Sequence, residues 1–174
     1  MMLGKIYLDS ALERLSSYKS LGDNTIAQLT GEQMLWQPEG EPNSIYLIVK
    51  HLSGNMRSRW TDFLTSDGEK AWRNRDSEFE NGVASKEAII QLWNDGWKVI
   101  LDAIGSLTPD DLEKTVLIRS EPLIVLDAIN RQLMHVPYHV GQIVYLGKIL
   151  KGDKWLSLSI PKGGSQAFND RMMK

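Results

Sequence analysis

Hydrophobic side chains recur at spacings of three and four residues in four long segments of the chain. This spacing places them on one face of an α-helix, so the sequence predicts four long helices. The first is predicted from about Leu3 to Leu29, and we expect Gly22 to kink it. The pattern Thr30-x-x-Gln33 that follows is a capping box, which predicts one short helical turn.

The second helix is predicted to start at Asn43 or Ser44, because both residue types are good N-caps, and to end near Leu64. The segment 66–82 is polar, contains glycine and shows no helical period. We therefore expect a long ordered loop there, and loops of this length in compact domains are often functional. Ser85 is predicted to cap the third long helix.

The C-terminal half begins with a start signal for a short helix, in which Thr108 is followed by proline and two acids. Residues 115–119 are rich in β-branched side chains, and we expect them to be briefly extended. The fourth long helix is predicted to start near Pro122 and to end at Gly152, a natural residue after a helix terminus. Ser165 is predicted to cap a last short helix.

With no convincing set of strands, the fold class expected is all-α: a four-helix bundle with long loops and short extra helices. A chain of 174 residues suits a single domain over residues 1–174. The net charge of −2 provides no basic face for nucleic acid. The chain contains no cysteine, which excludes disulfides and a cysteine nucleophile. No apolar run is long enough to span a membrane, so we expect a cytoplasmic protein.

The three histidines of the chain are the main candidates for chemistry. His135 and His139 are four residues apart, so on a helix they share one face and can bind one metal ion. His51, on the predicted second helix, would be the third ligand, because metal sites in bundles are built from facing helices. Three histidines leave one tetrahedral position open, as in catalytic zinc sites. Alternatively, they are core or surface residues. Pro137 is expected to kink the helix, which either aims the two rings or breaks their spacing.

Three polar residues share the helical faces of these histidines. Asn55 and Arg59 follow the first histidine by one and two turns, and Gln142 follows the last by three residues. As functional groups they would orient a ligand histidine or bind a substrate carboxylate. As structural groups they would be a buried amide and an arginine paired with Asp62 or with an acid of the loop.

Other candidates lie around the predicted loop. Arg73 and Arg75 either bind an anionic substrate at the mouth of the bundle or pair with acids of the same segment, and we favour the pairing, since a run of charges is usually a solvated face. Trp60 and Trp72 border the candidate site and are expected to line a pocket.

The runs NSIYLIVKHLSGNMRSRWTDFLTSDGEKAWRNRDSEFE and HVPYHVGQIVYLGK, with the tail SIPKGGSQAFN, resemble the DinB/YfiT-like superfamily of metal-dependent enzymes. The likeness covers nearly the whole chain. The resemblance implies a four-helix bundle, often a homodimer, with an open three-histidine site for zinc, nickel or a similar ion. The ligands of that family are one histidine on the second helix and an H-x-x-x-H pair on the last long helix, which correspond to His51, His135 and His139.

The resemblance also implies a reaction class. Characterised relatives include transferases that use low-molecular-weight thiols such as bacillithiol or mycothiol, and a thiol-dependent isomerase. We therefore expect a thiol-dependent S-transferase acting on small electrophilic compounds, because a metal ion keeps a thiol ionised and nucleophilic. The alternatives are a hydrolase that uses metal-bound water and a non-catalytic homodimer that binds a metal or ligand. The absence of an obvious general base favours the transferase.

Overall fold

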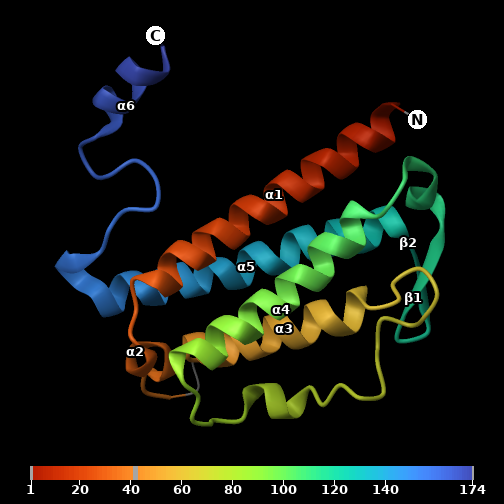
Figure 1. The fold of residues 1–174 in the computed structure, drawn as a ribbon, viewed down its shortest axis with the longest axis horizontal. Helices are drawn as coiled ribbons and strands as arrows, with labels where there is room; N and C mark the ends of the chain where they lie inside the picture. Colours follow the sequence, from red (N-terminus) through yellow and green to blue (C-terminus); the bar gives the residue numbers. More distant parts are fainter. Residues whose placement is uncertain (1, 41–42, 174) are drawn as a thin grey trace.

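The computed structural model of the protein describes residues 2–40 and 43–173, and over these residues the fold is mostly helical (Figure 1). The four long helices are α1 (Met2–Ala27), α3 (Ile45–Trp60), α4 (Lys86–Gly105) and α5 (Val125–Lys151). The short helices are α2 (Gly31–Leu35), η1 (Asp76–Phe79), η2 (Pro109–Glu113), η3 (Gly152–Lys154) and α6 (Ser165–Met172). The strands β1 (Thr115–Ile118) and β2 (Glu121–Ile124) form one antiparallel hairpin. The prediction of an all-α fold is confirmed.

The long helices pack in two pairs, α3 on α4 and α1 on α5, and contacts of α1 with α4 and of α3 with α5 join the pairs. The hairpin lies at the end of this assembly where α3 ends and α5 begins, and the segment that leads to α6 extends away from the long helices (Figure 1). No helix in the part of the chain that the structure describes is long and apolar enough to cross a membrane.

The core forms where the apolar stripes of the four long helices meet, and it includes Leu15, Trp97, Ile100 and Ile129 with no exposed surface. Such burial stabilises the fold by about 1.5–3 kcal/mol for each large side chain.

Gly22 marks a close approach between α1 and α4 instead of interrupting α1, which continues as one helix to Ala27. A Cβ at residue 22 would overlap the ring of Trp93. The indole Nε1 of Trp93 donates a hydrogen bond to Asp23 Oδ1 over 2.6 Å, which fixes this contact.

Helix starts agree well with the caps read from the sequence. The hydroxyls of Ser44 and Ser85 accept hydrogen bonds from the backbone N–H groups of the first turns of α3 and α4. The Thr30–Gln33 capping box is also confirmed. The last short helix differs slightly, since Ser165 is its first residue and Gly164 its N-cap.

Two boundaries were predicted wrongly. The α3 helix ends at Trp60, before Leu64, because Thr61 is extended and Asp62 adopts a positive φ of 48°. The α5 helix starts at Val125 and not near Pro122, because residues 121–124 form the second strand of the hairpin.

The turn of this hairpin explains why the second strand was missed. Its two central residues, Arg119 and Ser120, have φ values of 58° and 62°. Turns of this kind usually contain asparagine or glycine, and this sequence gives no such signal. Here Asp67 stabilises the turn from outside, since its carboxylate accepts the backbone N–H groups of Arg119 and Ser120 over 2.8 and 2.7 Å.

Pro137 lies inside α5, and the helix continues through it from Val125 to Lys151. The expected end at Gly152 is confirmed, with a positive φ of 51° at that glycine.

Candidate metal centre

The structure brings the three histidines together from two helices. His51 is on α3, and His135 and His139 are on α5. One nitrogen of each ring lies within 4.8 Å of the corresponding nitrogens of the other two, and the Nε2 atoms of His51 and His135 are 3.2 Å apart. The rings of His135 and His139 have centroids 4.7 Å apart, so Pro137 does not disrupt the spacing that the sequence predicted.

Two of the three rings are oriented by a hydrogen bond at Nδ1. The Nδ1 of His51 lies 3.0 Å from Glu78 Oε2, and the Nδ1 of His139 lies 2.8 Å from Gln142 Oε1. An acceptor at Nδ1 selects the tautomer with a proton there, which leaves the Nε2 lone pair available for a metal ion. The Nδ1 of His135 is buried and has no hydrogen-bond partner among residues 2–40 and 43–173.

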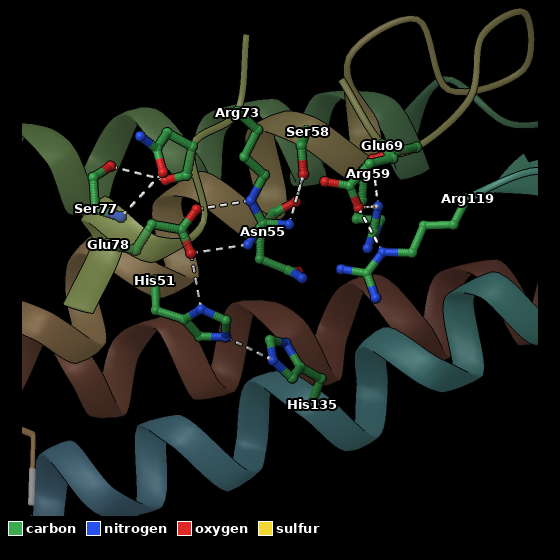
Figure 2. Close-up of polar contacts among 12 residues, drawn as sticks. His51, Asn55, Ser58, Arg59, Glu69, Arg73, Ser77, Glu78, Arg119 and His135 are labelled. Carbon is green, nitrogen blue, oxygen red and sulfur yellow. Dashed lines mark hydrogen bonds and ion pairs between the residues drawn. The ribbon is translucent and has the colours of Figure 1, made fainter. Parts of the chain in front are cut away.

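Glu78 is the centre of a buried polar network beside His51 (Figure 2). Arg73 donates to both of its oxygens, from Nε over 2.7 Å and from a terminal nitrogen over 3.0 Å, and also donates to Ser58 Oγ over 3.1 Å. Burial raises the pKa of Glu78, but the hydrogen bonds from His51 and Arg73 outweigh it, and the pKa lies below its ordinary value. Glu78 is therefore ionised at neutral pH and is fully engaged by its two partners.

The donor set fits a divalent transition metal. Burial, followed by the neighbouring His139 and His51, lowers the pKa of His135 to about 3. Burial also lowers the pKa of His139. Both imidazoles are thus neutral at pH 7, and the neutral form is the one that coordinates a metal. Three imidazole nitrogens, one of them backed by a carboxylate, are typical of zinc and are also suited to nickel.

A cavity of about 200 Å³ lies directly beside the histidines, and His51 and His135 form part of its wall. Its polar lining includes Asn55, Trp60, Gln132 and five arginines: Arg59, Arg73, Arg75, Arg119 and Arg131. Among the described residues, no aspartate or glutamate lines it. The cavity wall therefore carries a net positive charge, and two of the three histidines, His51 and His135, belong to it.

Of the polar residues predicted near the histidines, Gln142 orients His139, as described above. Asn55 lines the cavity, and its buried Oδ1 has no hydrogen-bond partner within the described chain. Arg59 donates to the carbonyl oxygen of Gly68 and forms an ion pair with Glu69 over 3.2 Å. The partner of Arg59 is thus an acid of the loop and not Asp62.

Of the remaining sequence candidates, Trp60, Arg73 and Arg75 line the cavity and Trp72 does not. Trp60 is buried and lines the cavity. Trp72 is not among the lining residues; it is 55% exposed and lies under the guanidinium of Arg57, 5.6 Å from its ring centroid. Arg73 forms the predicted pairing with an acid of its own segment and also lines the cavity; Arg75 lines the cavity and forms no ion pair with the described residues.

Sequence reasoning missed the role of Glu78 as the partner of His51, and it missed Arg119, Arg131 and Gln132 altogether. Arg131 and Gln132 lie four and three residues before a candidate ligand on the same helix, so helical spacing was a usable signal for both. Glu78 belongs to the short helix η1, inside the segment predicted as a loop, and Arg119 belongs to the hairpin turn, so no periodic pattern identifies either.

The comparison with known proteins agrees with this picture. The family model described as "Protein of unknown function (DUF1572)" matches residues 2–164. That family stands in the DinB/YfiT-like context that the sequence resembles. Among the curated proteins, none matches the chain. Because the model covers nearly the whole chain, the protein belongs to the DUF1572 family.

Proposed function

We propose that His51, His135 and His139 bind one divalent metal ion, zinc or nickel, in a catalytic centre. The observation that carries this proposal is the convergence of three imidazole nitrogens beside a cavity. Three protein ligands leave one coordination position free, and in this geometry the free position would face the cavity. Glu78 and Gln142 fix two of the rings, which is the usual role of outer hydrogen-bond partners at metal sites.

The reaction we propose is the transfer of a small thiol to an electrophilic compound. A metal ion at the three histidines would lower the pKa of the thiol and so supply a thiolate at neutral pH. The sulfur forms a bond to the electrophilic carbon, and the leaving group departs with its electron pair. The chain contributes the geometry: the histidines would hold the ion that binds the thiol, and the cavity wall would position the second reactant next to it.

The cavity favours this reaction over hydrolysis. Hydrolysis with bound water commonly uses a carboxylate or histidine as general base. The nearest carboxylate, Glu78, is engaged by His51 and Arg73, and no other acid lines the cavity within the described residues. A thiol has a lower pKa than water and needs no such base.

The test starts with metal content. Protein purified without a histidine tag and without chelator is analysed by elemental mass spectrometry, beside a His51→Ala/His139→Ala variant and a Met134→Ala control. Met134 is 77% exposed on α5, so its replacement changes the same helix without touching the centre. We expect about one equivalent of metal in the wild type and the control, as for a single three-ligand site, and none in the histidine variant.

Turnover then decides the chemistry. The metal-loaded protein is mixed with 1-chloro-2,4-dinitrobenzene and bacillithiol or mycothiol, and the thioether product is followed by absorbance. Thiol-dependent turnover that the histidine variant lacks supports the transferase. Hydrolysis of an ester in the absence of thiol would instead identify the protein as a hydrolase. Bound metal without either activity would indicate a non-catalytic site. A wild type that stays metal-free in the presence of zinc and nickel would refute the metal centre itself.

A further inference from the structure

The five arginines around the cavity are only partly neutralised. Glu69 pairs with Arg59 and with Arg119, and Glu78 pairs with Arg73. In the described part of the chain, Arg75 and Arg131 form no ion pair, although both line the cavity. Two carboxylates, one of them shared with His51, therefore face five guanidinium groups, and the wall keeps an excess of positive charge.

The unpaired charge lies on the exposed part of the cavity wall, because Arg75 and Arg131 are exposed, and the buried arginines are the ones that pair with acids. Arg59 is only 7% exposed, and burial lowers the pKa of its guanidinium. Glu69 opposes this effect, but the charges of Arg73 and Arg119 lower the pKa of Arg59 further. Crowding like charges in a desolvated site costs folding free energy unless a counter-charge compensates them. Glu69 and Glu78 compensate the two buried arginines, Arg59 and Arg73, so the charges left for a ligand are those of Arg75 and Arg131.

Two neutral donors in the same wall also lack acceptors. Trp60 and Gln132 line the cavity and are 3% and 4% exposed. Trp60 Nε1 and Gln132 Nε2 are buried and make no hydrogen bond to any residue that the structure describes. The indole N–H can only donate, so it requires an acceptor. A buried donor without a partner costs folding free energy, which an acceptor oxygen placed against it would recover.

We propose that the cavity binds the anionic group of the substrate, a carboxylate or a phosphate, with Arg75, Arg119 and Arg131 as its charged contacts and Trp60 and Gln132 as neutral donors. Both groups present oxygens in the geometry that guanidinium groups bind through paired hydrogen bonds. A volume of 200 Å³ corresponds to about seven water molecules. It therefore has room for a carboxylate or phosphate on a short carbon chain.

The position of the cavity links this group to the reaction. His51 and His135 belong to the cavity wall, so an anion bound by the arginines lies next to the three histidines. In Figure 2 the side chain of Arg119 extends from the hairpin toward Arg59 and Glu69, on the side of the site where His135 lies. The identification of the anion as part of the substrate rests on the proposed function; the binding of an anion does not.

The experiment is a calorimetric titration of the zinc-loaded protein with succinate, with inorganic phosphate and with succinamide, which has the length of succinate but no charge. We expect saturable binding of one anion or both and none of succinamide. Arg75→Gln and Arg131→Gln should each weaken anion binding roughly tenfold, since each removes a charged hydrogen bond. Arg14→Gln, an exposed arginine of α1 outside the cavity, should leave it unchanged.

The His51→Ala/His139→Ala variant separates this inference from the proposed function. Anion binding that persists in that variant and weakens in Arg131→Gln supports the arginine cavity, whether or not the metal centre is catalytic. Binding that is lost in the histidine variant but unaffected by either arginine substitution would mean that the anion binds only the metal, and the inference would be wrong. Absence of saturable binding of both anions would also overturn it. The stronger of the two anions identifies the substrate class.

Discussion

The carboxylate of Glu78 lies in the space that a side chain at Gly54 would occupy. Gly54 is three residues after His51, on the same face of α3, so the absence of its side chain lets the loop bring an acid against the helix beside the histidine. A glycine inside a helix costs about 1 kcal/mol relative to alanine. At this position the cost is compensated by the close approach of Glu78.

Replacement of Gly54 by alanine should therefore weaken metal binding, although alanine is the better residue for the interior of a helix. The new Cβ would overlap Glu78 Oε1 and push the carboxylate away from His51. Loss of such an outer partner typically lowers metal affinity 10–100-fold, and we expect about this loss in a competition titration of zinc against a chromophoric chelator.

Gly141→Ala is the matched control, because Gly141 lies inside α5 and a Cβ there meets no atom within 4 Å. It should stabilise the protein slightly through helix propensity and leave zinc affinity unchanged. Equal zinc affinities of the Gly54→Ala and Gly141→Ala variants would show that the contact with Glu78 does not affect the centre.

Glu78 and Arg73 should be coupled energetically, because each is the main partner of the other in a buried site. Glu78→Gln leaves a buried guanidinium without a counter-charge, and Arg73→Gln leaves a buried carboxylate. The two single variants and the double variant, compared by urea unfolding, should give a coupling free energy of about 1–3 kcal/mol. Additive effects within a few tenths of a kcal/mol would contradict a functional ion pair.

The hairpin turn should depend on Asp67. Asp67→Ala removes the acceptor of the backbone N–H groups of Arg119 and Ser120, whose left-handed conformation is otherwise unfavourable. We expect faster hydrogen exchange of these two amides, measured by mass spectrometry on peptides that cover the turn. Asp110→Ala, an exposed acid of η2, should leave this exchange as in the wild type. Unchanged exchange in Asp67→Ala would mean that the strands alone fix the turn.

Tyr7 provides a test of pH dependence. Its hydroxyl lies 2.7 Å from Asn130 Oδ1 and 3.1 Å from the carbonyl oxygen of Leu126, and so joins α1 to α5. Burial, with a smaller contribution from Asp127, raises the pKa of Tyr7 from 10.0 to about 12. A raised pKa means that the folded state retains the proton more strongly. The stabilisation is fully present below pH 10 and is lost as pH rises through 12.

Tyr7→Phe should thus lower the free energy of unfolding by about 1 kcal/mol at neutral pH, and the difference from the wild type should shrink as pH rises from 10 toward 12. Urea unfolding at a series of pH values measures this difference. The control is Tyr18→Phe, since Tyr18 lies on the same helix and its hydroxyl makes no hydrogen bond to the described residues. A difference between wild type and Tyr7→Phe that stays constant to pH 12 would contradict the interpretation.

The sequence was sufficient to predict those features that depend on local pattern. The caps at Ser44 and Ser85 and the end at Gly152 followed from residue type and position. The pair His135 and His139 followed from helical spacing alone. Features that depend on distant partners were not predictable in this way. The Arg119–Ser120 turn has no turn residues of its own and is stabilised by a carboxylate more than 50 residues earlier in the chain.

The same limit applied within the site. His51 and Glu78 are 27 residues apart, on a helix and on a segment without helical period. Their pairing becomes visible only when the loop is placed on α3. The one local clue was the interior glycine at residue 54, and a glycine in a helix indicates a close neighbour without saying which residue it is.

The hydrogen bond between His51 and Glu78 has a thermodynamic consequence for the whole segment 66–82. Coupling between two binding events is reciprocal. If docking of this segment strengthens metal binding, metal binding therefore strengthens the docking of the segment by the same free energy. The same segment carries Glu69, which pairs with two arginines of the cavity, and Arg75, which lines it. Binding of an ion by the three histidines would therefore also order the cavity wall that carries Glu69 and Arg75. The histidines and the wall would then both be in place before the second reactant binds.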